Sequence, residues 1–193
     1  MMKRLILVRH SKPKMSRTIP GHDWRLSERG RKLCTPLADK LTGYDVDVVV
    51  TSNEPKAEET GEIIADHLGV LMRTIGGLQE QARFTMPWYE TAEDRADAML
   101  PLFDNWDDVV FGEESAQAAF ERFNHAIEGL NERYDDKVVT VVTHGTVMAL
   151  FLEKRAGLDA KDFWMNMGIP MYVSLLPDGD NYKVEAIVTD VEE

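Results

Sequence analysis

The sequence predicts an α/β fold: a three-layer α/β/α sandwich around a mostly parallel central sheet. Short runs of apolar and β-branched residues alternate with longer segments whose apolar residues recur every three or four positions. The short runs are bounded by polar residues and suit strands that are buried on both faces. Strands that alternate with helices typically form a parallel sheet with helices on both sides. For 193 residues we expect one domain, 1–193.

The first strand and helix are marked by clear boundaries. The run LILV at 5–8 is apolar and ends on Arg9 and His10, which predicts a buried strand. Ser27 is a favourable N-cap, so a helix is expected from there to Gly43. The β-branched run VDVVVTS at 46–52 predicts the second strand.

The middle of the chain contains one clear helix and one irregular region. Pro55 is favoured in a first helical turn and Gly69 suits the end of a helix, so we expect a helix over 55–68. A strand should follow near 70–75. Residues 76–110 read as a loop and then a helix broken by proline, and we interpret them as an insertion on the substrate side.

The last third of the chain repeats the alternation. Aromatic and aliphatic residues on one face predict a helix over about 114–133. The run VVTVVTHG at 138–145 predicts another buried strand, followed by a helix over 146–155. Two strands near 170–176 and 182–188, separated by the turn sequence PDGDN, are expected at a sheet edge.

Charge and composition exclude several classes of protein. The net charge is −12 and the pI is about 4.9, so we expect no nucleic-acid partner and no docking on an anionic membrane. No apolar run is long enough to span a membrane, and the first residues read as a strand, which favours a cytoplasmic protein. The single cysteine, Cys34, cannot form an internal disulfide, and no spacing suggests a zinc site. The oligomeric state is left open.

Polar groups follow three of the predicted strands, where ligands of parallel α/β sheets bind. Arg9 and His10 end the first strand, Thr51 and Ser52 end the second, and His144 ends a later one. The arginine fork suits phosphate oxygens, and a neutral imidazole can act as a nucleophile. The small residues Ser11 and Gly145 follow the two histidines, so their backbone N–H groups could approach a ligand. These residues predict an anion pocket.

The order of these motifs resembles the histidine phosphatase superfamily, the phosphoglycerate-mutase-like fold. The motifs that carry the resemblance are Arg9-His10-Ser11, the segment DWRLSERG at 23–30, the segment SNEPKAEET at 52–60, Leu78-Gln79-Glu80, Gly112-Glu113-Glu114-Ser115 and Val142-Thr143-His144-Gly145. Asn166 resembles a late asparagine of the family. Each motif is short, but six in this order cover nearly the whole chain.

The resemblance implies a two-step phosphoryl transfer that needs no metal or other cofactor. His10 would attack the phosphorus of a small phosphorylated metabolite, and Glu80 would act as general acid and then as general base. Arg9, Lys56 and His144 would hold the phosphoryl oxygens, with Ser11 and Gly145 beside them. We expect His10 to be neutral and His144 to be a cation.

Two departures from the family pattern leave alternatives open. Ser11 stands where the family usually has glycine, and Lys56 replaces a phosphate-binding arginine, which removes the bidentate fork. The main hypothesis is a phosphatase that hydrolyses a small phosphomonoester through a phosphohistidine on His10. The alternatives are a phosphoglycerate mutase, a protein phosphohistidine phosphatase and a non-catalytic phospho-ligand-binding protein, which Lys56 favours.

Overall fold

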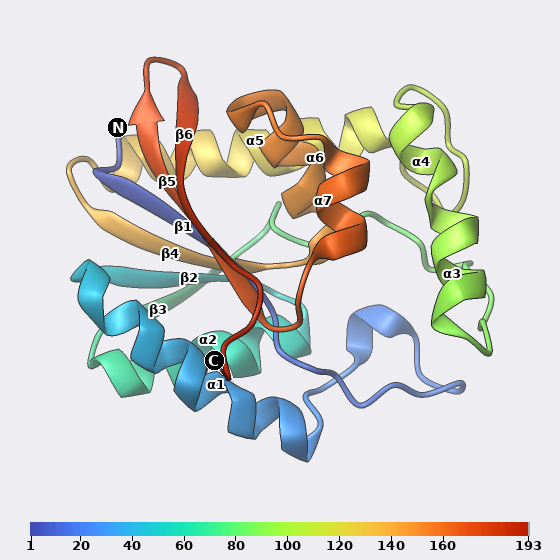
Figure 1. Ribbon diagram of the computed structural model, residues 1–193, viewed down its shortest axis with the longest axis horizontal. Coiled ribbons are helices and arrows are strands. Elements are labelled where there is room, and N and C mark those ends of the chain that lie inside the picture. The colour runs from blue at the N-terminus through green and yellow to red at the C-terminus, as the bar shows by residue number, and fades with distance from the viewer. Residues whose placement is uncertain (193) are drawn as a thin grey trace.

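A six-stranded sheet forms the centre of the protein in the computed structural model, which describes residues 1–192 (Figure 1). The strand order is β3-β2-β4-β1-β5-β6. The strands are β1 (Arg4–Arg9), β2 (Val48–Ser52), β3 (Leu71–Ile75), β4 (Val138–Thr143), β5 (Met171–Asp178) and β6 (Asn181–Val188). The first four run parallel, and β5 and β6 form an antiparallel hairpin at the edge beside β1. The predicted α/β fold with a mostly parallel sheet is confirmed.

Helices cover both faces of this sheet (Figure 1). The helices α1 (Glu28–Leu41) and α2 (Pro55–Leu68) pack on one face, and α5 (Ala116–Arg133), α6 (Gly145–Ala156) and α7 (Ala160–Asn166) pack on the other. The short helices α3 (Ala92–Met99) and α4 (Pro101–Asp104) lie to one side, and two 3₁₀ turns span Gly21–Asp23 (η1) and Thr42–Tyr44 (η2). The sheet therefore separates two apolar cores, each closed by helices.

The helix boundaries follow the expected local chemistry. Ser27 caps α1 by accepting the N–H of Gly30, and Ser115 caps α5 by accepting the N–H of Ala118. Gly69 ends α2 with φ +67°, a left-handed conformation that glycine adopts without a Cβ clash. These end signals are local, and the predicted boundaries agree with the structure within about two residues at each end.

Two elements differ from the sequence-based expectation. Helix α7 is absent from the prediction, because its seven residues are too few to show a helical repeat, although Asp159 caps it by accepting the N–H of Asp162. Strand β5 continues through Pro177 to Asp178, so the hairpin turn is shorter than the sequence PDGDN suggests. Proline is tolerated there because it lies near the end of the strand, beyond Leu175, the last residue of β5 that pairs with β1. Within residues 1–192, no helix combines the length and the apolar character that crossing a membrane requires.

Candidate active site

The carboxyl ends of β1 and β4 bring the two predicted histidines together. Arg9 lies beside Thr143 in the parallel register, and the His10 N–H donates to the Thr143 carbonyl at 2.9 Å. The residue after each strand is a histidine, and the ring centroids of His10 and His144 are 5.1 Å apart at an interplanar angle of 61°. Two imidazoles that are 134 positions apart in the sequence therefore occupy one pocket.

The tautomer of His10 is set by its own backbone neighbour, and its protonation state by burial and nearby charge. Its Nδ1 lies 2.8 Å from the carbonyl oxygen of Ser11. A carbonyl only accepts hydrogen bonds, so Nδ1 carries the proton and Nε2 keeps its lone pair. Burial, followed by the positive charges of Lys56 and Arg9, lowers the pKa of His10 to about 3. His10 is therefore a neutral imidazole with a free Nε2 at neutral pH.

His144 is fully buried beside it. Its Nε2 lies 2.9 Å from the Ser52 hydroxyl, and its Nδ1 is buried with no hydrogen-bond partner among residues 1–192. Burial, followed by the positive charge of Lys56, holds the pKa of His144 well below its ordinary value. The expectation that His144 is a cation is therefore wrong for the ligand-free pocket, because the cost of burying the charge exceeds any stabilisation offered there.

Lys56 lies inside the pocket and is held by a carboxylate. Its buried ammonium donates to the Gly21 carbonyl at 2.8 Å and forms an ion pair with Glu54. The other oxygen of Glu54, Oε1, accepts the Glu80 N–H at 2.8 Å and lies 3.5 Å from Nε2 of His144. Glu54 was not among the predicted site residues, although a carboxylate two residues before the expected phosphate-binding cation is visible in the sequence.

Glu80 receives four hydrogen bonds. One oxygen accepts the N–H groups of Gln81 and Val147 at 2.9 and 3.2 Å, and the other accepts Arg83 Nη2 and the Thr146 N–H at 2.8 and 3.2 Å. Burial disfavours the carboxylate, but Arg83 and the backbone donors outweigh it and lower the pKa of Glu80 to about 2. Glu80 is therefore ionised in the free site. The first amides of α6 bind this carboxylate.

Arg9 and Gly145 fit against each other. The Arg9 Nη1 donates to the Gly168 carbonyl at 3.0 Å, and its Nε is buried without a hydrogen-bond partner in the described chain. A Cβ at Gly145 would lie 3.2 Å from Arg9 Nε and 2.8 Å from the Met167 sulfur. Glycine at 145 therefore leaves room for the guanidinium. Burial lowers the pKa of Arg9 to about 10, so Arg9 remains charged at neutral pH.

Ser11 has a different role from the predicted one. Its hydroxyl donates to the Gly30 carbonyl at 2.7 Å, and its N–H donates to the Thr60 hydroxyl at 3.0 Å. Both donors are already used by the surrounding helices, so the assignment of Ser11 to phosphate binding is corrected. Ser11 instead fixes the backbone carbonyl that orients His10.

The loop that carries Glu80 is anchored by Arg122 of α5, a residue that sequence analysis also missed. The Arg122 guanidinium donates to the carbonyls of Gly77, Gln79 and Glu80 at 2.9, 2.9 and 3.2 Å. It also pairs with Glu114 at 2.8 Å. The only sequence signal for this anchor was the motif that contains Glu114, because an arginine on a helix has no pattern that distinguishes it from surface charge.

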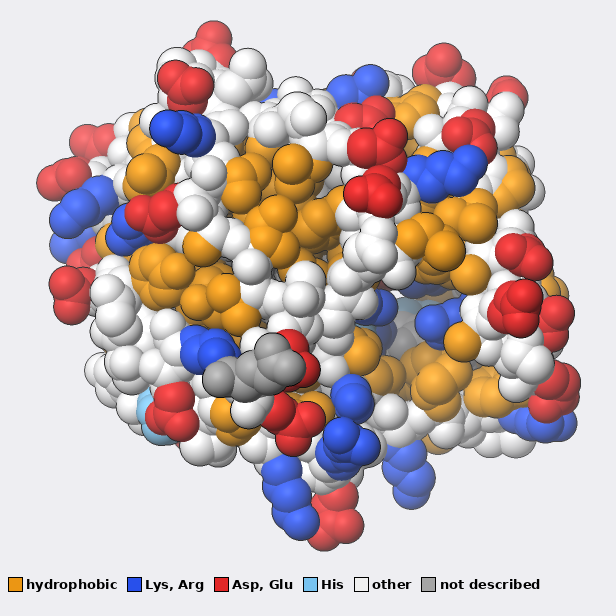
Figure 2. All heavy atoms as spheres, viewed as in Figure 1, with side chains coloured by type: hydrophobic (Ala, Val, Ile, Leu, Met, Phe, Trp, Pro, Cys, Tyr) orange, Lys and Arg blue, Asp and Glu red, His pale blue; other side chains and the backbone are white. Residues whose placement is uncertain are grey.

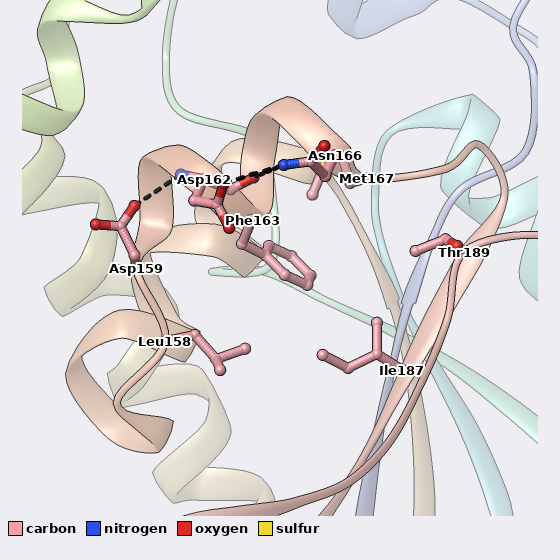
Figure 3. A pocket seen from close by; sticks show the side chains of 8 residues that line it. All are labelled: Leu158, Asp159, Asp162, Phe163, Asn166, Met167, Ile187 and Thr189. Atoms are coloured by element: carbon pink, nitrogen blue, oxygen red, sulfur yellow. Dashed lines mark hydrogen bonds between the residues drawn. The ribbon is translucent and has the colours of Figure 1, made fainter.

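Figure 2 shows a hollow between α3 and the end of α7, with Lys and Arg atoms around its opening. A separate pocket of about 240 Å³ lies between α7 and β6, where Leu158, Phe163 and Ile187 point toward one another (Figure 3). Asn166 is at the rim of that second pocket and donates to Asp162, so its expected match to a site asparagine is not supported.

No group of three or more potential metal ligands is arranged to hold an ion in residues 1–192, and metal independence stays a prediction.

Comparisons with known proteins agree with this geometry. The family model of the histidine phosphatase superfamily (branch 1) matches residues 5–187. The Arabidopsis thaliana phosphoglycerate mutase-like protein 4 is 28% identical over 191 residues, covering 94% of this chain and 83% of that protein.

Solved structures share the fold. A mycobacterial glucosyl-3-phosphoglycerate phosphatase in complex with inorganic phosphate superposes with a TM-score of 0.78 at 20% identity, covering 99% of both chains. A variant of Entamoeba histolytica phosphoserine phosphatase bound to phosphoserine gives 0.75 at 14% identity, covering 100% of this chain and 98% of the other. The chain belongs to the histidine phosphatase superfamily, branch 1, and we class it accordingly as a phosphoric monoester hydrolase.

Proposed function

We propose that this enzyme hydrolyses a small phosphomonoester without a metal ion, through a phosphohistidine on His10. The observation that carries the proposal is the state of His10: its Nδ1 proton is fixed on the Ser11 carbonyl, which leaves the lone pair on Nε2. Arg9 and Lys56 place positive charge around this nitrogen, where the transferring phosphoryl group would develop negative charge.

In the first step, Nε2 of His10 forms a bond to phosphorus while the bond from phosphorus to the ester oxygen breaks. The leaving alkoxide needs a proton, and Glu80 is ionised before substrate binds. The proton therefore enters with the monoanionic form of the substrate, passes to Glu80 and goes on to the leaving oxygen. The products of this step are a free alcohol and phosphohistidine.

In the second step, water attacks the phosphorus of the phosphohistidine. Glu80, again a carboxylate, accepts a proton from this water as the new oxygen–phosphorus bond forms. The phosphorus–nitrogen bond breaks, its electron pair returns to Nε2, and inorganic phosphate is released. Glu80 then gives its proton to the departing phosphate and His10 returns to the neutral form with its proton on Nδ1, so the cycle closes.

The substrate side of the site is proposed to be the segment 76–110. This segment contributes Arg83, which pairs with Glu80, and Arg95 on α3. Burial and the neighbouring charge of Arg83 lower the pKa of Arg95, so the two guanidinium groups lie near each other. We propose a small phosphorylated metabolite as the substrate, in line with the phosphorylated compounds in the names of the structural relatives.

A non-catalytic phospho-ligand-binding protein is the second candidate, and it is favoured by Lys56 in place of the expected arginine, because lysine keeps the charge but loses the bidentate fork. Hydrolysis of p-nitrophenyl phosphate in the presence of EDTA separates the candidates. We expect phosphate release by the wild type, loss of at least about 10³-fold with His10→Ala, and no loss with His125→Ala, an exposed histidine on α5. Phosphate binding without any hydrolysis would favour the binding protein, and activity lost with EDTA would indicate a metal site.

A further inference from the structure

Glu54 places a negative charge among the groups that should bind phosphate. Its side chain is only 9% exposed, and its carboxylate contacts Lys56, the Glu80 N–H and, at 3.5 Å, Nε2 of His144. Buried carboxylates are uncommon unless they are paired. Here the partner is Lys56, the cation beside both histidines. The carboxylate therefore neutralises a charge that the phosphoryl group would otherwise use.

The position of this carboxylate is not explained by helix capping. Glu54 is the N-cap residue of α2, where an acidic side chain commonly accepts the first amides of its own helix. The Glu54 side chain accepts none of them, and only its backbone carbonyl binds the N–H groups of Ala57 and Glu58. The carboxylate instead lies between Lys56 and the loop of Glu80. This contact is the one that requires an explanation.

The negative charge of Glu54 should weaken the binding of a phosphate anion in the pocket. Two negative groups within a few ångströms repel strongly in a partly buried site, where the effective dielectric constant is far below that of water. A phosphate dianion in the pocket would meet Arg9 as a cation, but Lys56 only as half of an ion pair. The pocket should therefore bind phosphate less tightly than its lysine, arginine and histidine side chains suggest.

We propose that Glu54 sets the phosphate affinity of the pocket by holding Lys56 in an ion pair, which weakens the binding of inorganic phosphate and speeds its release. The inference rests on the proposed phosphatase function. It assigns to Glu54 a positioning and charge-setting role, distinct from the proton transfer of Glu80. It also accounts for the ammonium at 56, which donates one hydrogen to Glu54 and one to the Gly21 carbonyl and keeps its third for a phosphoryl oxygen.

The test is the substitution Glu54→Gln, which keeps the shape and removes the charge. The dissociation constant of inorganic phosphate, measured by calorimetry, should fall by about tenfold or more, and product inhibition by phosphate should strengthen in parallel. Glu62→Gln is the matched control, since Glu62 is exposed on the same helix, and it should leave both constants unchanged. A merely structural role of Glu54 would not produce tighter binding.

Unchanged or weaker phosphate binding by folded Glu54→Gln would overturn the inference. If this variant does not fold, Glu54→Met carries the same expectation, because it also removes the charge at similar length. The two proposals fail differently: a wild-type protein that hydrolyses no phosphomonoester contradicts the proposed function, whereas active wild type with unchanged phosphate affinity in the variant contradicts only the role of Glu54.

Discussion

Hydrogen bonds to the backbone decide the state of individual residues in this pocket. The Ser11 carbonyl fixes the tautomer of His10, and the amides of Gln81, Thr146 and Val147 help Arg83 to keep Glu80 ionised. Backbone groups cannot rearrange without moving the strand or helix that carries them. The nucleophile and the proton carrier are therefore preorganised before substrate arrives.

Glu80→Gln tests the proton transfer at this scale. The amide keeps the shape but cannot deliver a proton to a leaving alkoxide, so hydrolysis of alkyl phosphates should fall by about 10²–10⁴-fold. Hydrolysis of p-nitrophenyl phosphate should fall much less in its first step, because nitrophenolate leaves without protonation. Single-turnover release of each leaving group measures this difference.

Glu113→Gln is the control for this experiment. Glu113 also accepts backbone amides, from Phe84 and Thr85, but it is exposed to solvent. We expect this variant to slow neither substrate by more than about twofold. An equal loss on alkyl and aryl phosphates in Glu80→Gln would assign Glu80 an electrostatic role in place of proton transfer.

Sequence alone could predict residue types but not their final partners. The position of Arg9, His10 and His144 at strand ends follows from strand boundaries and from the rule for parallel sheets. The ion pair of Glu54 with Lys56 depends on a side-chain direction that no periodicity encodes. The neutral state of His144 depends on complete burial, which only the packed structure shows.

At the scale of elements, the site depends on how α1 and α2 support the loop after His10. Gly30 of α1 lies against Lys12, and the Gly30 carbonyl accepts the Ser11 hydroxyl. Thr60 of α2 accepts the Ser11 N–H. The segment 23–30 was recognisable as a motif, but its physical reason is this close approach of helix and loop.

Gly30→Ala should disturb that contact. A Cβ at this position would lie 2.1 Å from the Lys12 carbonyl oxygen, a backbone atom that cannot move alone. We expect a loss of about 1–3 kcal/mol in the free energy of unfolding, measured with urea, together with reduced hydrolysis. Gly129→Ala on α5 should instead raise the free energy of unfolding. A Cβ there meets nothing within 4 Å, and alanine favours the helix by about 1 kcal/mol. Equal stability changes in the two variants would show that helix propensity, and not the loop contact, dominates at Gly30.

The alternation of elements was predictable because the apolar runs and end signals are local. Helix α7 and the exact course of residues 76–110 were not, since short helices and loops are fixed by tertiary contacts. Arg122 illustrates the point: it holds three loop carbonyls from a helix that lies far from the loop in the sequence.

At the scale of the whole molecule, burial of two neutral histidines links stability to pH. The pKa of His10 is about 3 in the folded state, below its ordinary value of 6.5, so only the unfolded chain binds the proton between these values. The free energy of unfolding therefore falls as pH falls through this window. The depressed pKa of Glu80 acts in the same direction below pH 4.5.

Between pH 7 and 5, we expect His10 to contribute about 2 kcal/mol to this loss. Urea unfolding of the wild type and of His10→Asn at both pH values measures the contribution, because asparagine does not titrate. The difference in unfolding free energy between the two pH values should be smaller in the variant. The same difference in both proteins would show that His10 titrates alike in the folded and unfolded states.

The most direct test of the account is to trap the phosphoenzyme. Substrate mixed with enzyme and quenched in base should give protein carrying one phosphoryl group on His10, stable in base and lost in acid, and absent from His10→Ala. A phosphoryl group on another residue, or a base-labile adduct, would contradict His10 as the nucleophile.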